Sequence, residues 1–404
     1  MKKWLQIGLG IVTSIAGYLD AGSFATAVQA GAAFGFRLLW VLLLGTLCIV
    51  GLTEMAGRLT AVSKHTLRDA VHERFGFNFS ICILVIGVVL DLLVLASEIG
   101  GVSFALQLAT GISFQWWALP VAFLLWLLLW KGTFGLIQNG VSLFGLVTLA
   151  FVVAVFLLAP PWREIARGLA PSLPGSHQTH YWFIAVSILG ATISPYMIWF
   201  YSSGAIEDHW DEGYLTANRA VAAIGMGFGS SLSAAILIVA ALVLLPKGIQ
   251  VDSYRQVAGM LSGVFPHWGF AFVVATLAIG SFGAALEVAL AMAYGIAQVF
   301  GWIWGEDKQP REAARFTLVY TAGLFLASLL ILAGIEPLRL TVLTMALVAA
   351  SLPLVAVPLL LLMNDREYMG AHTNGWLGNT VVIFVIALAL VLAVVAIPLQ
   401  FLGS

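Results

Sequence analysis

Charge and cysteine are both scarce in this chain, and each shortage limits what the protein can be. Asp, Glu, Lys and Arg make up 9% of the 404 residues, whereas a soluble domain carries roughly 25%. The formal net charge of −1 leaves no basic patch, so we expect no nucleic-acid partner. Two cysteines, Cys48 and Cys82, are too few for a disulfide framework or a zinc site. The sequence has no phosphate loop and no nucleophile–base arrangement, so we expect neither an enzyme nor a bound cofactor.

Hydrophobic residues, in contrast, make up 61% of the chain and form long apolar runs. A run of about 18 or more apolar residues is long enough to cross a bilayer as a helix. We therefore predict an all-α polytopic membrane protein, surrounded by lipid, with one transporter domain over residues 1–404. Eleven spans are expected, at residues 5–35, 38–62, 80–110, 114–130, 134–159, 181–208, 218–245, 268–300, 315–334, 339–363 and 376–400.

Lys and Arg are distributed unevenly between alternate loops. If the N-terminus lies inside, the inner loops hold twelve of these residues and the outer loops hold six. The positive-inside rule then predicts a cytoplasmic N-terminus and an external C-terminus, in the plasma (inner) membrane. The oligomeric state cannot be derived from the sequence, and a monomer is compatible with it.

Two of the expected spans carry helix-breaking signals at their centres. Asp20 lies within span 5–35, where a carboxylate is costly unless it faces a partner or a wet cavity, and Gly22-Ser23 beside it weakens the helix. Pro195 interrupts span 181–208 near residue 194. The breaks open two five-span halves, which indicates an inverted repeat of residues 1–160 and 181–363, with 376–404 as an additional helix.

The sequence around the breaks resembles the Nramp family of metal transporters. The first break resembles the family motif Asp-Pro-Gly-Asn-x-x-Thr, and the second resembles Gly-Ala-Thr-x-Met-Pro-His-Asn. Similarity continues through residues 29–43, 56–59 and, more weakly, 352–354. The matching segments here read Asp20-Ala21-Gly22-Ser23-Phe24-Ala25-Thr26 and Gly190-Ala191-Thr192-Ile193-Ser194-Pro195-Tyr196-Met197.

The resemblance implies a LeuT-like inverted 5+5 repeat with helices 1 and 6 broken, an eleventh helix, and divalent-metal transport by alternating access. By position, the metal ligands would be Asp20, Ser23, the carbonyl of Ala191, and Ser194. Ser23 stands where the family has asparagine, and Ser194 stands where it has methionine. Hard oxygen ligands suit Mg²⁺, Ca²⁺ or Mn²⁺, so we expect Mg²⁺, with Mn²⁺ also accepted. Met197, one turn after Ser194, is an alternative source of a soft sulfur.

The resemblance also bears on proton coupling and on the pathway. Tyr196 and Tyr201 stand where the family has two histidines, and tyrosine has a reference pKa of about 10, so we expect weak or no coupling. Of the family's paired acids on span three, Glu98 alone is retained. Glu98 and Glu287 are buried carboxylates expected in the pathway or around the metal's waters, where Thr192, Tyr196 and Met197 are also placed.

Two alternatives remain open at this point. The first is a proton-coupled Mn²⁺/Fe²⁺ importer of the ordinary Nramp type. The second is an amine or amino-acid carrier of the same fold. Asp20 argues against an anionic substrate group, because a fixed negative charge would repel it, but a cationic amine remains compatible with the sequence.

Overall fold

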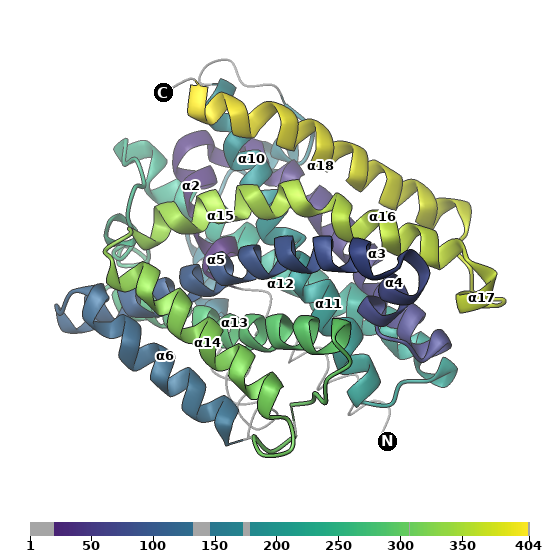
Figure 1. Cartoon of the computed structure of the whole chain (residues 1–404). Helices are drawn as coiled ribbons and strands as arrows, with labels where there is room; N and C mark the ends of the chain where they lie inside the picture. Colours follow the sequence, from purple (N-terminus) through teal and green to yellow (C-terminus); the bar gives the residue numbers. More distant parts are fainter. Residues whose placement is uncertain (1–19, 132–145, 173–177, 307, 403–404) are drawn as a thin grey trace.

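The computed structural model describes residues 20–131, 146–172, 178–306 and 308–402, and every regular element within these ranges is helical (Figure 1). The N-terminal half of the expected span 5–35 and the beginning of span 134–159 lie outside the described residues. The larger helices up to the second break are α2 (Ala21–Phe34), α3 (Leu39–Ser63), α4 (Leu67–Phe75), α5 (Phe77–Thr110), α6 (Phe114–Trp130), α8 (Leu149–Leu157), α9 (Trp162–Gly168) and α10 (Gln178–Thr192). After it follow α11 (Pro195–Glu207), α12 (Leu215–Val243), α13 (Gly269–Val299), α14 (Ala314–Leu332), α15 (Pro337–Ser351), α16 (Pro353–Asn364), α17 (Arg366–Met369) and α18 (Trp376–Leu402).

Most of these helices are long and apolar enough to cross a membrane. Within the described residues, seven helical stretches meet that standard, and Phe114–Trp130 and Trp376–Val391 are shorter apolar helices. One stretch, Ala21–Ser63, contains both α2 and α3, joined by the 3-10 turn η1 (Gly35–Leu38). Each of the eleven expected spans coincides with at least one helix over its described part. The prediction of an all-α, LeuT-like membrane protein is confirmed by these helices and by the structural comparisons given below.

The chain reverses direction between α2 and α3, and both helices pack on α12. Gly31, near the end of α2, lies against the backbone of Leu237 in the second half of α12. Gly57, late in α3, lies against Asn218 at the start of α12, and the Asn218 side chain donates to Glu54 O at 2.9 Å. In both places a Cβ in place of the glycine hydrogen would collide with its neighbour. These close contacts hold α2 and α3 along one face of α12.

Helix α5 is the central element of the other half of the molecule (Figure 1). It packs on α13, α15, α6 and α14. Two hydrophobic clusters result, one mainly around α2, α3, α10 and α12 and the other around α5, α6, α13 and α14. Ala191, Tyr196 and Met345 belong to the second cluster, and the half-buried Met197 packs against both. The second helix break therefore lies at the boundary between the two clusters.

The breaks differ in detail from the sequence expectation. Gly22-Ser23 was expected to weaken the helix beside the break near Asp20, but both residues lie inside the first turn of α2, which Asp20 caps. The second break falls between Thr192 and Pro195, as expected. The expected span 339–363 is divided at Leu352, because Pro353 cannot donate a backbone hydrogen bond to the preceding turn. A further bend of 119° separates Leu146–Leu157 from Trp162–Gly168.

Candidate metal-binding site

Asp20 is the N-cap of α2 and is buried, with 2% of its surface exposed. Its backbone is extended, and its Oδ1 accepts a hydrogen bond of 2.6 Å from the amide of Ser23. This bond satisfies one of the amides that a helix leaves free at its N-terminus. The positive end of the helix dipole also favours the charged carboxylate. The carboxylate is therefore fixed at the start of α2, with its negative charge favoured there.

Glu98 of α5 holds the same turn from the opposite side. Its Oε2 accepts a hydrogen bond of 3.0 Å from the amide of Ala21, and its side chain is completely buried. In the described part of the chain, Glu98 Oε1 has no hydrogen-bond partner. The residue that sequence reasoning placed in the pathway therefore contacts the backbone of the first break directly. That contact fixes where α2 begins relative to α5.

The second break exposes carbonyl groups at the end of α10. Ser194 has extended backbone angles and is completely buried. Its hydroxyl donates to Gly190 O at 3.1 Å and makes a longer contact of 3.5 Å with Ala191 O. Because the last carbonyls of a helix have no intrahelical partner, Ala191 O can still accept a cation or a water. Thr192 is less available, because its hydroxyl donates to Ile188 O at 2.7 Å.

The two breaks approach each other across a small cavity whose lining is partly polar and partly apolar. Ser23 from α2 and Thr192 from α10 both line it, and its empty volume is about 220 Å³. Hydroxyl groups supply its polar lining, and Leu42, Ile188 and Leu237 supply apolar walls. The remaining polar residues of the lining are Thr26 and Ser233. Of the expected ligands, the structure thus places Ser23 beside the end of α10, which carries Ala191 and is followed by Ser194, the N-cap of α11.

Met345 of α15 is a residue that sequence reasoning missed. Its sulfur lies so close to Gly22 that a Cβ on that glycine would be 2.6 Å from Sδ. Its carbonyl lies closer still to Gly190 on α10. The completely buried Met345 therefore contacts the first turn after one break and the last turn before the other. The sequence signal was weak, because Met345 is one of two methionines in span 339–363 and has no motif around it.

The remaining expected pathway residues surround this centre. Tyr196 is buried, and its hydroxyl has no hydrogen-bond partner in the described part of the chain. The hydroxyl feels the charges of four carboxyl groups, those of Asp20, Glu287, Glu98 and Asp91. Glu287 on α13 is itself buried. Met197 is half-buried between the two hydrophobic clusters, and its amide donates to Ser194 O at 3.1 Å.

The donor set is poor in the side chains that hold transition metals permanently. Among the described residues, no group of three or more His, Cys, Asp or Glu side chains converges on one point. The centre instead combines the Asp20 carboxylate, serine and threonine hydroxyls, helix-end carbonyls and the Met345 thioether. Such a set can hold a cation transiently, and the protein need not bind it as a resident cofactor.

A family model described as "Natural resistance-associated macrophage protein-like" (Nramp) matches residues 10–398. The chain belongs to the Nramp family. It is thus a multi-pass membrane transporter and not an enzyme. Similar curated proteins include the divalent metal cation transporter MntH of Deinococcus radiodurans, 28% identical over 384 residues, which cover 90% of this chain and 83% of that protein. MntH of Pectobacterium carotovorum is 27% identical over 413 residues, which cover 97% of this chain and 94% of that protein.

Solved structures support the same Nramp fold. A mutant of the Eremococcus coleocola manganese transporter superposes with a TM-score of 0.77 at 18% identity, covering 98% of this chain and 87% of that one. MhsT in complex with L-phenylalanine superposes with a TM-score of 0.60 at 14% identity, covering 96% of this chain and 97% of that one. At these identities the likeness shows the fold alone. It places this Nramp chain in the LeuT-like architecture expected from the two breaks.

Proposed function

We propose that this Nramp-family protein carries divalent metal cations across the plasma membrane by alternating access, with Mg²⁺ as the main substrate and Mn²⁺ also accepted. The observation that carries this proposal is the buried Asp20 carboxylate, which caps α2 where the two broken helices approach each other. A buried charge of this kind requires a partner, and a transported cation supplies one. The names of the MntH relatives support the substrate class.

The choice of Mg²⁺ and Mn²⁺ follows from the ligand chemistry. Ser23 and Ser194 offer hard hydroxyl oxygens, and Ala191 offers a carbonyl oxygen. Mg²⁺ sheds its waters reluctantly and is commonly held by one or two carboxylates with several waters in place. Asp20 would supply the charge, and the hydroxyls would orient the waters. Mn²⁺ accepts the same oxygen ligands.

Weak or absent proton coupling is the second part of the proposal. Tyr201, at a position where the family has histidine, donates its hydroxyl to Asn218 Oδ1 at 2.8 Å. Glu98 is engaged by the amide of Ala21. Neither of these two hydrogen bonds connects groups that would pass a proton along near neutral pH. The proposed membrane orientation, with a cytoplasmic N-terminus and an external C-terminus, rests on the twelve-to-six distribution of Lys and Arg between the two sides.

Reconstituted flux tests the proposal directly. Purified protein in liposomes is supplied with Mg²⁺, Mn²⁺, Ca²⁺ or Cd²⁺ while internal pH is recorded. We expect Mg²⁺ and Mn²⁺ uptake without internal acidification, and Asp20→Ala should abolish it. Asp252→Asn is the matched control, because Asp252 is an exposed carboxylate. Its only ion pair is a long one at the surface, with 3.8 Å between its Oδ1 and Arg339 Nη2 among the described residues. Undiminished flux in Asp20→Ala would overturn the site, and acidification with uptake would overturn the uncoupled mechanism.

One observation favours a second candidate, the proton-coupled Mn²⁺/Fe²⁺ importer. The Met345 sulfur lies against Gly22, so a soft donor is present near the first break after all. Soft thioethers favour softer metals over Mg²⁺. Strong competition by Cd²⁺, together with internal acidification, would support this candidate over the first.

A further inference from the structure

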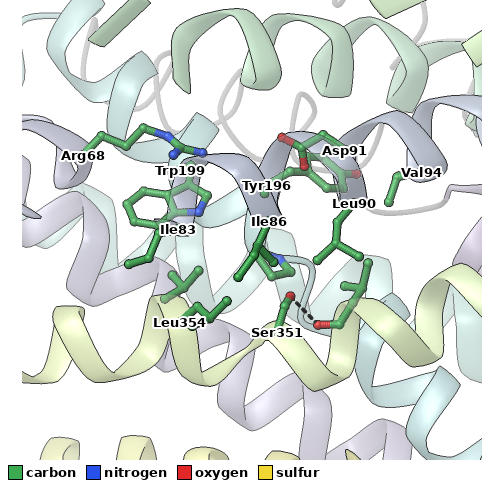
Figure 2. Close-up of a pocket in the computed structure, with 14 residues that line it drawn as sticks. Arg68, Ile83, Ile86, Leu90, Asp91, Val94, Tyr196, Trp199, Ser351 and Leu354 are labelled. Atoms are coloured by element: carbon green, nitrogen blue, oxygen red, sulfur yellow. Dashed lines mark hydrogen bonds between the residues drawn. The ribbon is translucent and has the colours of Figure 1, made fainter. Parts of the chain in front are cut away.

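A second cavity lies beside the second helix break, and Asp20 is not part of its lining (Figure 2). Its empty volume is about 410 Å³, including the part open to the surface. Pro195 and Tyr196 line one end, and Arg68 of α4 lines the other. Its walls are mostly aliphatic and come from α5, α15 and α16. The proposed orientation places α4 on the cytoplasmic side, so the cavity lies along the inner half of the protein.

Arg68 is a buried charge without a close ionic partner among the described residues. Only 5% of its surface is exposed, and its guanidinium carbon lies 4.4 Å from the ring centroid of Trp199, as Figure 2 shows. Gly295 makes room for it, because a Cβ there would be 2.8 Å from the guanidinium carbon. In the part of the chain that the structure describes, Arg68 Nε has no hydrogen-bond partner. A buried guanidinium held by stacking alone needs a compensating negative charge nearby.

Asp91 of α5 provides that charge from across the cavity. It is 7% exposed and lines the same space as Arg68 and Tyr196 (Figure 2). The two charges attract each other, but they do not come within the 4.0 Å of an ion pair. Nor does the described part of the chain contain a hydrogen bond to the Asp91 carboxylate. Both oxygens of Asp91 are therefore available to a group that enters the cavity.

Tyr196 connects this cavity to the central site. It lines the cavity, and it belongs to the same hydrophobic cluster as Ala191 and Met345, which lie beside the two breaks. A cation that leaves Asp20 towards α4 would pass this hydroxyl and then meet the Asp91 carboxylate. Oxygen ligands of these kinds suit a partly hydrated divalent cation.

We propose that Asp91 is a second, transient binding station for the transported divalent cation. In this proposal the cation replaces Arg68 as the positive charge that neutralises the Asp91 carboxylate. This inference rests on the proposed transport function. When the station is empty, Arg68 neutralises Asp91 across the cavity. When a cation arrives, it takes over that carboxylate, and the repulsion from Arg68 weakens its binding there, so that the cation stays only transiently.

Charge-neutral variants of similar shape test the proposal, with Mn²⁺ as the probe. Uptake into liposomes measures transport, and calorimetric titration of Mn²⁺ measures binding at the Asp20 site. We expect Asp91→Asn to lower the uptake rate by about tenfold while the Mn²⁺ affinity stays unchanged. Asp91→Glu keeps the charge and should retain most of the uptake. The double variant Arg68→Gln/Asp91→Asn removes both buried charges and should be as slow as Asp91→Asn.

The double variant distinguishes two roles of Asp91, binding of the cation and mere neutralisation of Arg68. If Asp91 served only to neutralise Arg68, removing both charges would restore the wild-type rate, and the proposal would be wrong. Wild-type uptake in Asp91→Asn alone would also overturn it. If the unmodified protein carries no divalent cation, it is the proposed function that fails. The two failures are distinguishable because every variant is compared with the unmodified protein in the same liposomes.

Discussion

The backbone amide of Ala21 donates a hydrogen bond to Glu98 Oε2 at 3.0 Å, and both residues are completely buried. The bond joins residues 77 positions apart in the sequence. A carboxylate of α5 thereby fixes the first residue of α2, and with it the position of the neighbouring Asp20. The placement of the proposed metal ligand Asp20 thus depends on a helix that carries none of the expected ligands.

Glu98→Gln and Glu98→Ala should differ sharply for this reason. Gln retains an oxygen that can accept from the amide of Ala21, so we expect near-normal Mn²⁺ uptake. Ala leaves a buried amide without a partner, which costs about 1–3 kcal/mol, and should lower both thermal stability and uptake. Liposome flux and a thermal unfolding assay measure the two effects. Equal loss of uptake in both variants would instead indicate that Glu98 carries a proton.

Met345→Leu tests whether the thioether reaches the transported ion. Leucine has a similar volume without sulfur, so the fold should be retained. We expect Cd²⁺ to compete with Mn²⁺ uptake about tenfold less strongly, while Mg²⁺ uptake is unchanged. Met197→Leu is the matched control, because the half-buried Met197 packs between the hydrophobic clusters. A larger effect in the Met197 variant would indicate that the soft donor is the Met197 sulfur of α11 and not the Met345 sulfur.

Gly190→Ala should destabilise the protein, because its Cβ would collide with the backbone carbonyl oxygen of Met345. Overpacking of this kind costs roughly 1–3 kcal/mol, and the midpoint of thermal unfolding should fall accordingly. Gly204→Ala in α11 is the control, because no described atom lies within 4 Å of the added Cβ. Alanine is favoured over glycine inside a helix, so this variant should be neutral or slightly stabilising. Equal midpoints for the two variants would contradict the close contact.

Arg58→Ala should loosen the segment that precedes α18. Arg58 Nη1 donates to His372 O at 2.7 Å, and Nη2 donates to Asn374 Oδ1 at 2.8 Å, while Glu54 holds the same guanidinium at 3.0 Å. We expect faster amide hydrogen exchange over residues 370–376 in this variant. Arg58→Lys should show the same increase, because one ammonium group cannot reproduce the planar set of donors. Unchanged exchange in both variants would show that other contacts hold the segment.

Much of the fold could be predicted from local features of the sequence. Apolar runs predicted the spans, and two helix-breaking residues, the buried acid Asp20 and Pro195, predicted the breaks. The Glu54–Arg58 ion pair was also predictable, because residues four apart lie side by side on a helix. The helical state of Gly22-Ser23 was not, because it depends on the Asp20 carboxylate capping the turn rather than on the propensities of glycine and serine.

The rest depends on contacts between distant segments. Met345 contacts Gly22 across more than 300 residues of sequence, and no periodic pattern encodes that contact. Arg68 looked like one of many cytoplasmic charges that orient the protein, and its stacking on Trp199 appears only after α4 packs against α11. The proposed metal ligands and the division into repeats at 1–160 and 181–363 remain predictions that flux and mutagenesis can test.

The glycine contacts of the two broken helices also have a mechanical consequence. Gly31 allows α2 to pack closely against the backbone of α12, whereas Gly190 allows α10 to pack closely against the backbone of α15. Ala191 is thus supported by α15, whereas α2, which Asp20 caps, is supported by α12 as well as by Met345 of α15. Any sliding of these supports would pull the ligands apart and weaken their hold on the ion. The affinity for the metal ion would then depend on how the supporting helices are aligned. A shift between these helices would be enough to release the ion, with no separate change at the ligands themselves.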